Sequence, residues 1–382
     1  MWRWKTIPLK SRQTALQLTC PHSPCPQLRR RTYSYSHRSP SMSSKSFPKT
    51  IKAIGLHKNG DLNVIEELKD IPFPESDDQS VIVKVEYAGV NFIDTYQRAG
   101  LYPTAKFPMI LGSEASGTVV KLPTSEESIH GLKIGDRVAV ILSGSFAEYI
   151  AVPAWKVGKL PPNVDTKAAG AVILQGLTAL TFARESYPIQ KGDVILIYAA
   201  AGGVGTLLTG IALHAGATVI ATVSSETKAE YVRSLGAQHV LNLSTQNVVD
   251  EVLKITNGEG VHAVFDGVGK DTFEDNFKLI RRKGTIVSLG NSSGVAPPLN
   301  ILRLGEKNLR ILRPRLFGYI ATPEELRHYE DELFSLLGSG VIKAQIHQEY
   351  PFTAAGVQQA QKDITSRGTI GKLLINVSSA TT

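Results

Sequence analysis

Residues 193–205, with the sequence Asp-Val-Ile-Leu-Ile-Tyr-Ala-Ala-Ala-Gly-Gly-Val-Gly, decide the fold of this chain. The apolar run 194–197 does not alternate with polar residues, which is typical of a strand buried on both faces of a parallel sheet. Glycines follow at once, and residues 206–215 then carry apolar side chains at the spacing of a helix with one buried face. This order of strand, glycine turn and helix predicts a site where backbone N–H groups and a helix N-terminus bind a pyrophosphate.

The glycine pattern in residues 200–205 lacks the first glycine of the dinucleotide fingerprint, so its context must support the interpretation. A second strand, expected at 218–223, should end beside the adenosine ribose, where an acidic residue would bind the 2′-hydroxyl of NAD. Instead, Ser224 and Ser225 follow the strand, with Lys228 close behind. A carboxylate repels a 2′-phosphate and an ammonium attracts it, so these residues predict NADPH as the cofactor. The alternative is a structural glycine turn with a solvent-facing lysine.

Charge and composition separate the first 49 residues from the rest. The 382-residue chain is 42% hydrophobic and 20% charged, which is ordinary for a globular protein of more than one domain. Ten of its 42 Lys and Arg residues and none of its 34 acidic residues lie in 1–49, which leaves 32 basic residues against 34 acidic ones. The remainder is therefore nearly neutral and has no excess positive charge for polyanion binding. No uninterrupted apolar run reaches the length of a membrane span.

The segment 1–49 is rich in Arg and Ser and free of acidic residues, which is the composition of a mitochondrial transit peptide. A disordered basic tail is the alternative, and translation from Met42 would give a cytoplasmic protein. Cys20 and Cys25 are the only cysteines, and both lie in this segment. The rest of the chain therefore has no thiolate nucleophile and no cysteine ligand for a metal.

The fold class predicted from the remaining pattern is α/β, with a strand-rich domain and a doubly wound parallel sheet. Residues 50–172 indicate short strands, including a hairpin with Asn59-Gly60 as a two-residue turn between strands 51–56 and 62–66. A helix at 166–186 should connect the domains. Strands near 194–198, 218–223, 239–242, 261–266, 285–289 and 309–312 alternate with helices. Helices at 323–338 and 354–366 and a strand at 372–377 should return to the first domain. The predicted domains are 50–172 with 313–382, and 173–312 for the cofactor.

Four motifs carry a family resemblance: Gly-Val-Asn-Phe-Ile-Asp-Thr-Tyr at 89–96, Gly-Leu-Tyr-Pro at 100–103, Ala-Ala-Ala-Gly-Gly-Val-Gly at 199–205 and Gly-Asn-Ser-Ser-Gly at 290–294. Over about residues 50–377 the chain resembles the NADPH:quinone oxidoreductases related to zeta-crystallin, the zinc-free branch of the medium-chain dehydrogenase/reductase superfamily. The resemblance implies a GroES-like β-barrel catalytic domain, a Rossmann cofactor domain, a homodimer, and one-electron or two-electron reduction of quinones, ortho-quinones among them, by NADPH.

Zinc-bearing relatives hold their catalytic zinc with a cysteine, the histidine of a Gly-His-Glu motif and a second cysteine. This chain has Asn91 in place of the first cysteine and Gly112-Ser113-Glu114 in place of Gly-His-Glu, and it lacks the structural-zinc lobe. An amide and a hydroxyl do not supply the thiolate and imidazole that zinc prefers, so no metal is expected. Without a Lewis acid the acceptor must already be electrophilic, as a quinone or an enone is.

The resemblance also implies the site residues. Asn91, Tyr96 and Tyr102 are the expected donors and stacking groups for the acceptor, and Arg313 is the expected charge stabiliser, with Arg310 and Arg315 as near alternatives. The expected cofactor-binding residues are Thr178, Gly202, Gly203, Val204, Ser224, Lys228, Asn291, Ser292 and Arg367. Leu243 stands where the family often has a tyrosine near the adenine, which leaves more of the selectivity to Lys228 and Arg367.

Two other functions stay open at this point. A 2-alkenal or enone reductase would use the same site. Some relatives bind AU-rich RNA or sequester NADPH, although the nearly neutral body offers no basic stripe for RNA.

Overall fold

The computed structural model describes residues 47–102 and 106–378. The predicted targeting segment therefore lies outside the described residues apart from its last three positions. Its role in mitochondrial import and the alternative start at Met42 stay predictions.

A six-stranded sheet forms from the alternating strands and helices, in the order β11-β10-β9-β12-β13-β14. All of its neighbouring strands are parallel. The strands are β9 (Val194–Ile197), β10 (Thr218–Val223), β11 (His239–Asn242), β12 (Val261–Asp266), β13 (Ile280–Ser288) and β14 (Arg310–Leu312). The chain order reverses between β9 and β12, which is where doubly wound sheets bind their ligands. The predicted parallel sheet is confirmed.

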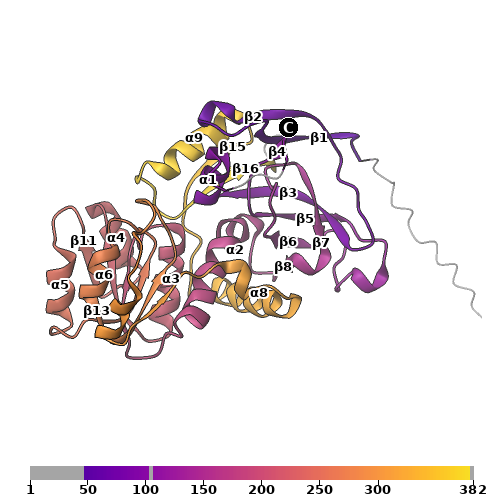
Figure 1. Cartoon of the computed structure of the whole chain (residues 1–382). Coiled ribbons are helices and arrows are strands. Elements are labelled where there is room, and N and C mark those ends of the chain that lie inside the picture. Colours follow the sequence, from indigo (N-terminus) through magenta and orange to yellow (C-terminus); the bar gives the residue numbers. More distant parts are fainter. Residues whose placement is uncertain (1–46, 103–105, 379–382) are drawn as a thin grey trace, which may run out of the picture. The chain divides into compact units, whose positions relative to one another are not determined.

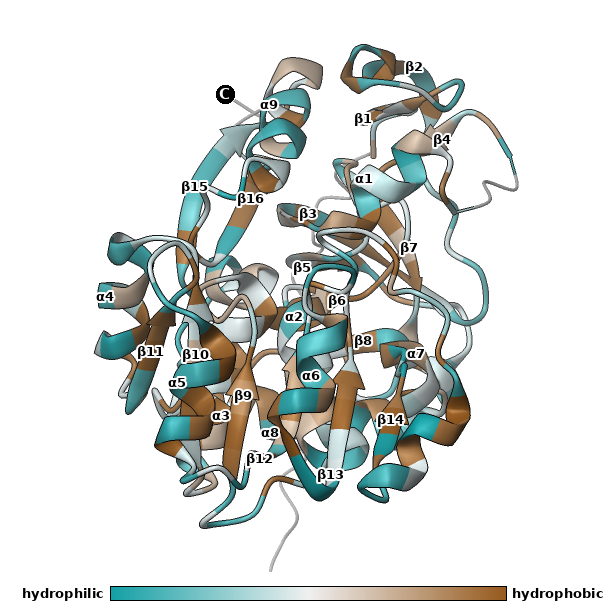
Figure 2. Ribbon diagram, turned by 60° about the vertical axis from the view of Figure 1, so that its left-hand side comes forward, coloured by the Kyte–Doolittle hydropathy of each residue, from teal (hydrophilic) through white to brown (hydrophobic). Residues whose placement is uncertain are grey.

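Four helices connect these strands: α3 (Gly203–His214), α4 (Glu226–Ser234), α5 (Val248–Ile255) and α6 (Phe273–Leu279). Side chains cap two of them at the first turn, because the hydroxyl of Ser225 accepts from the Lys228 N–H and the amide of Asn247 accepts from two backbone N–H groups. Figure 2 shows β9 coloured as hydrophobic along its length, in agreement with its burial between the helices.

The strand-rich part is organised around β3 (Ser80–Val90), which pairs antiparallel with β5 (Ala115–Lys121), β7 (Tyr149–Pro153) and β16 (Lys372–Asn376). The sheet continues through β6 (Arg137–Val140) and β8 (Val157–Lys159) on one side and β15 (Ile346–Pro351) on the other. A smaller sheet has the order β2 (Glu66–Pro72), β1 (Thr50–Leu56), β4 (Met109–Ile110). In Figure 1 the yellow C-terminal β16 lies beside the purple β3. The residue boundaries of the two domains stay a prediction.

The predicted two-residue hairpin at Asn59-Gly60 is wrong. Strands β1 and β2 do pair antiparallel, but β2 begins only at Glu66 and a short 3-10 helix, Leu62–Val64, precedes it. The side chain of Asn59 instead donates to the carbonyls of Gln97 (2.8 Å) and Arg98 (3.3 Å) at the end of α1 (Phe92–Ala99). The carbonyl of Gln97 also accepts from the C-cap N–H of Gly100, and that of Arg98 accepts from the N–H of Gly60. Asn59 and Gly60 thus cap the end of α1 instead of forming a hairpin turn.

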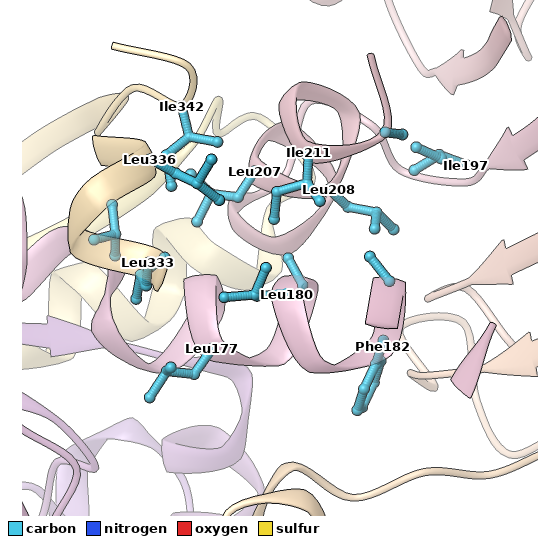
Figure 3. Close-up of a cluster of buried hydrophobic side chains, with 14 of the residues drawn as sticks. Leu177, Leu180, Phe182, Ile197, Leu207, Leu208, Ile211, Leu333, Leu336 and Ile342 are labelled. Atoms are coloured by element: carbon cyan, nitrogen blue, oxygen red, sulfur yellow. The ribbon is translucent and has the colours of Figure 1, made fainter. Parts of the chain in front are cut away.

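The largest hydrophobic cluster surrounds α2 (Thr166–Thr181), which continues as a π-helical turn over Phe182–Ser186. Figure 3 shows Leu180 of α2 pointing toward Leu207 and Ile211 of α3, with Leu333 of α8 (Pro323–Gly338) to one side; Leu177 points away from α3. By length and composition the helix Thr166–Ser186 could cross a membrane, yet 72% of its apolar window is buried inside the fold. It is therefore a core helix. The helix predicted at 166–186 is present, as α2 and the π-helical turn after it. The short α7 (Leu316–Tyr319) and α9 (Ala354–Thr365) complete the helices of the described residues.

Candidate active site

The glycine turn between β9 and α3 has a geometry that excludes side chains. A Cβ on Gly205 would lie 2.4 Å from the carbonyl oxygen of Ala199, and a Cβ on Gly203 would lie 1.8 Å from Oε1 of Gln175. Gly202 is the N-cap of α3, so the N–H groups of the first helical turn, including that of Val204, have no acceptor within the helix. These N–H groups can therefore bind a pyrophosphate.

A basic pair lies past the end of β10. Lys228 is half-buried in the first turn of α4, and its Nζ lies 3.3 Å from Oγ of Ser224 and 2.5 Å from the carbonyl oxygen of Arg367. Burial lowers the pKa of Lys228. The structure thus brings Arg367, 139 positions along the chain, to Ser224 and Lys228, which were predicted to bind the 2′-phosphate. Leu243, just beyond β11, is 42% exposed.

The loop after β13 meets the end of β14 through Arg313. Nη1 of Arg313 donates to the carbonyl of Ser288 at 2.7 Å. With the amide of Asn291 assigned from its neighbours, its oxygen accepts from Nη2 of Arg313 at 3.0 Å. Asn291 and Arg313, two predicted site residues from different loops, are therefore joined. These contacts favour Arg313 over Arg310 and Arg315 as the charge stabiliser. Ser292 is exposed in the same loop, whereas the hydroxyl of Thr178 donates to Leu174 within α2 (2.8 Å).

Aromatic side chains from α1 and the following loop form a cluster, and one of them, Tyr96, lies near enough to Arg313 to feel its charge. The rings of Tyr96 and Tyr102 meet edge to face with centroids 5.8 Å apart, and Phe92 lies 6.4 Å from Tyr96. Burial, and then the phenol of Tyr102, raises the pKa of Tyr96, while the charge of Arg313 lowers it. The phenol of Tyr96 therefore stays protonated near neutral pH and can donate a hydrogen bond. Phe92 and Tyr102 are partly exposed, so their faces are open to a planar molecule.

Asn91 takes a different role from the expected one. Its side chain is only 4% exposed, and Nδ2 already donates to Oε1 of Glu114 (2.7 Å) and to the carbonyl of Gly89 (3.3 Å). Its Oδ1 accepts from Nζ of Lys372 (2.8 Å) and Nε2 of Gln175 (3.3 Å). Both ends of the amide are engaged by protein groups. The expectation that Asn91 donates directly to the acceptor is therefore corrected: it is a link in a buried hydrogen-bond network.

Asp94, at the start of α1, is also buried. Its carboxylate accepts from the N–H of Asn91 and from Oγ of Ser113, both at 2.8 Å. Burial raises the pKa of Asp94 to about 6, against the lowering effect of these hydrogen bonds and of Lys372. This carboxyl group thus holds the end of β3 and the start of α1 in place.

Sequence reasoning missed Lys372, Gln175 and the pairing of Glu114. The available signal was a lysine at the head of the apolar strand Lys-Leu-Leu-Ile-Asn, since a lysine is rarely fully buried without a partner.

Comparisons with known proteins match this arrangement. The alcohol dehydrogenase GroES-like domain profile matches residues 77–162, and the zinc-binding dehydrogenase profile matches residues 203–334. The quinone oxidoreductase of Salmonella typhimurium is 38% identical over 325 residues, which cover 84% of this chain and 98% of the relative. The chain belongs to the quinone oxidoreductase family. This family lies within the medium-chain dehydrogenase/reductase superfamily, as the sequence resemblance implied.

Other members and relatives of the quinone oxidoreductase family extend the comparison. The structure of the Escherichia coli quinone oxidoreductase in complex with NADPH matches with a TM-score of 0.80 and 37% identity, covering 85% of this chain and 99% of the other. The 2-haloacrylate reductase of a Burkholderia species is 34% identical and covers 85% of this chain and 98% of the relative.

The residues at the positions of the zinc ligands of zinc-bearing relatives show whether this chain can hold zinc. In the described part of the chain, no group of three or more His, Cys, Asp or Glu side chains could hold a metal ion. At the positions of the missing zinc ligands, Glu114 forms an ion pair with the ammonium of Lys372, and Asn91 and Ser113 are hydrogen-bonded to protein groups. A buried ammonium in this place repels a divalent cation, so these residues do not fit zinc.

Proposed function

We propose that this chain is an NADPH-dependent reductase of quinones that works without a metal. The observation that carries the proposal is that Tyr96, which meets Tyr102 edge to face, lies near enough to Arg313 for the guanidinium to lower its pKa, while Arg313 binds the Asn291 loop at the carboxyl end of the parallel sheet. Quinone oxidoreductases at 37–38% identity, one of them crystallised with NADPH, support it.

The cofactor is proposed to bind along the edge of the sheet from the basic pair to Arg313. Lys228 and Arg367 would bind the 2′-phosphate, and the first turn of α3 would bind the pyrophosphate. NADPH, when bound, supplies the reducing equivalents. Because Gly205 has no side chain, α3 packs closely against the Ala199 carbonyl, which fixes the helix N-terminus where the pyrophosphate would bind.

The acceptor is proposed to lie against Phe92, Tyr96 and Tyr102. The protonated phenol of Tyr96 can donate to a carbonyl oxygen, and the guanidinium of Arg313 can stabilise the negative charge that develops there. The nearby carboxyl groups are engaged: Asp94 accepts from Asn91 and Ser113, and Glu114 is paired with Lys372. Since neither of these two carboxyl groups is free to activate the acceptor, an electron-poor molecule is the expected substrate.

An activated alkene conjugated to a carbonyl is the second candidate acceptor. It is electron-poor in the same sense and would use the same donors. The 34% identical 2-haloacrylate reductase supports this alternative.

The test is NADPH oxidation by the chelated full-length protein with an ortho-quinone, a para-quinone and a 2-alkenal as separate acceptors. Turnover of the quinones with NADPH preferred over NADH is expected. Turnover of the alkenal alone would move the assignment to the second candidate. Loss of activity on chelation, restored by added zinc, would contradict the metal-free site.

We also propose that the protein is a homodimer joined through β14. This strand lies at the edge of the six-stranded sheet, so its outer backbone groups can pair with a second copy. Ile301 and Leu302, just before it, are 73% and 79% exposed, which is unusual for side chains of this size. Sedimentation should give the dimer mass, and Leu302→Asp should shift it toward the monomer. A monomeric wild type would rule out this interface.

Mitochondrial targeting by the first 49 residues is proposed on composition alone. Imaging of full-length and Met42-start fusions tests it. A full-length fusion found only in the cytoplasm would reject the proposal.

A further inference from the structure

A buried ion pair joins the two halves of the candidate site. Lys372 is the first residue of β16 and is 2% exposed, and its Nζ contacts Oε1 of Glu114, which is fully buried. The same Nζ donates to Oδ1 of Asn91 at 2.8 Å. Because each charge lies away from water, the pair is stable only while both members and their hydrogen bonds are in place.

The pair reaches the acceptor side through Glu114 and Asn91. Oε1 of Glu114 accepts from Nδ2 of Asn91 (2.7 Å), and Asn91 immediately precedes α1, the helix that carries Tyr96. Oε2 of Glu114 accepts from the N–H of Leu174 (2.8 Å), which lies in the middle of α2. The orientation of α1 relative to α2 therefore depends on this carboxylate.

The pair reaches the cofactor side through the backbone of β16 and through Gln175. Gly371, next to Lys372, donates its N–H to the carbonyl of Ala201 (2.8 Å) and forms a bridge with Gly202 in the glycine turn. Gln175 bonds to Asn91 through Nε2, and its Oε1 lies against Gly203 without a hydrogen-bond partner. Lys372 is thus linked to both sides of the site. Its backbone neighbour Gly371 contacts the turn that would hold the cofactor, and its own side chain contacts the acceptor side.

Stability alone does not require charges here, because apolar residues of similar volume often replace a buried ion pair with no loss of stability. Charged, hydrogen-bonded groups do define relative position more narrowly than apolar contacts. We propose that Lys372 is a positioning residue: its ion pair with Glu114 sets the spacing between the glycine turn and α1, and hence between the nicotinamide and the acceptor. This inference rests on the proposed reductase function.

The test compares Lys372→Met, Lys372→Arg and the double variant Lys372→Met/Glu114→Gln with the wild type. The single Met variant leaves Glu114 unpaired and should lower the unfolding midpoint, whereas the double variant removes both charges and should recover it. If Lys372 positions the site, the double variant should still lose about 100-fold in kcat, because a displacement of about 1 Å costs that much. Its NADPH dissociation constant, measured by fluorescence, should change far less than kcat, since the variant keeps Lys228, Arg367 and the backbone hydrogen bond from Gly371 to Ala201. Lys372→Arg should restore part of kcat.

Hydrogen exchange provides a measurement that does not depend on turnover. In the double variant, exchange should rise both at the start of α1 and in the glycine turn, across the site. Arg327→Met is the control away from the site, measured at pH 8 and above, because Arg327 lowers the pKa of the buried Glu330 of α8; its loss should lower stability there without changing kcat.

These measurements test the positioning role of Lys372 separately from the proposed reductase function. An active wild type together with a double variant of unchanged kcat and unchanged exchange would overturn the role of Lys372 and leave the reductase standing. A wild type inactive with every acceptor would reject the function, and the exchange pattern would then decide the positioning role by itself.

Discussion

Replacing Lys228 should weaken NADPH binding and leave NADH binding almost unchanged. The ammonium of Lys228 lies 3.3 Å from Ser224 Oγ and 2.5 Å from the carbonyl of Arg367, in a half-buried position past β10. A charge-assisted hydrogen bond to a phosphate oxygen contributes about 1.5–3 kcal/mol, which is about 10- to 150-fold in a dissociation constant. Lys228→Ala should raise the NADPH constant within this range, because the partly desolvated ammonium acts directly on the 2′-phosphate.

Lys228→Glu should have a larger effect, since a carboxylate about 4 Å from the phosphate adds about 1–4 kcal/mol of repulsion. NADH has no 2′-phosphate, so its constant should change less than about threefold with either variant. Both constants are measured by titrating nucleotide fluorescence at low ionic strength, and the Michaelis constants should follow them. The exposed Lys58, in the loop after β1, supplies the control Lys58→Ala.

The hydrogen bond from Lys228 to the Arg367 carbonyl predicts coupling between the two residues. Arg367→Ala should also weaken NADPH selectively, and the double variant should lose less than the sum of the single losses. Equal increases for NADPH and NADH with Lys228→Ala would refute the 2′-phosphate assignment.

Three further predictions test the acceptor side, the turn and a buried acid. Tyr96→Phe removes the proposed phenol donor and should lower kcat about tenfold or more with little change in NADPH affinity; an unchanged kcat would assign the ring to stacking alone. Gly205→Ala places a methyl group 2.4 Å from the Ala199 carbonyl and should lower the free energy of unfolding by about 1–3 kcal/mol and weaken NADPH, as judged by urea melts and titration. Burial raises the pKa of Glu330 to about 8, against the lowering effect of Arg327. Because the folded state then holds a proton that the unfolded state releases, stability from this group is complete below about pH 4.5 and falls as the pH rises to about 8. Glu330→Gln should therefore flatten the decline in urea midpoint between pH 5 and 8, and a parallel decline in both proteins would show that Glu330 ionises normally.

Local patterns in the sequence were enough to predict the parallel sheet. A strand buried on both faces and the helix after it differ in periodicity within a few residues, so the segments 194–197 and 203–214 could be identified without knowledge of their neighbours. The turn at Asn59-Gly60 failed as a prediction because its side chain caps the end of α1, about 40 residues away. No local pattern reports such a contact.

The doubly wound sheet, the glycine turn and the basic character beyond β10 could be predicted from the amino-acid sequence, because each depends on residues close together in the chain. Which side chains meet at the site became known only from the folded structure. Lys372 and Asn91 are 281 positions apart, and their contact turns a residue expected to face the acceptor into part of a buried network. Whether a side chain is buried, and which group it bonds to, depends on how distant segments pack together. The periodicity and composition of a single segment carry no information about that packing.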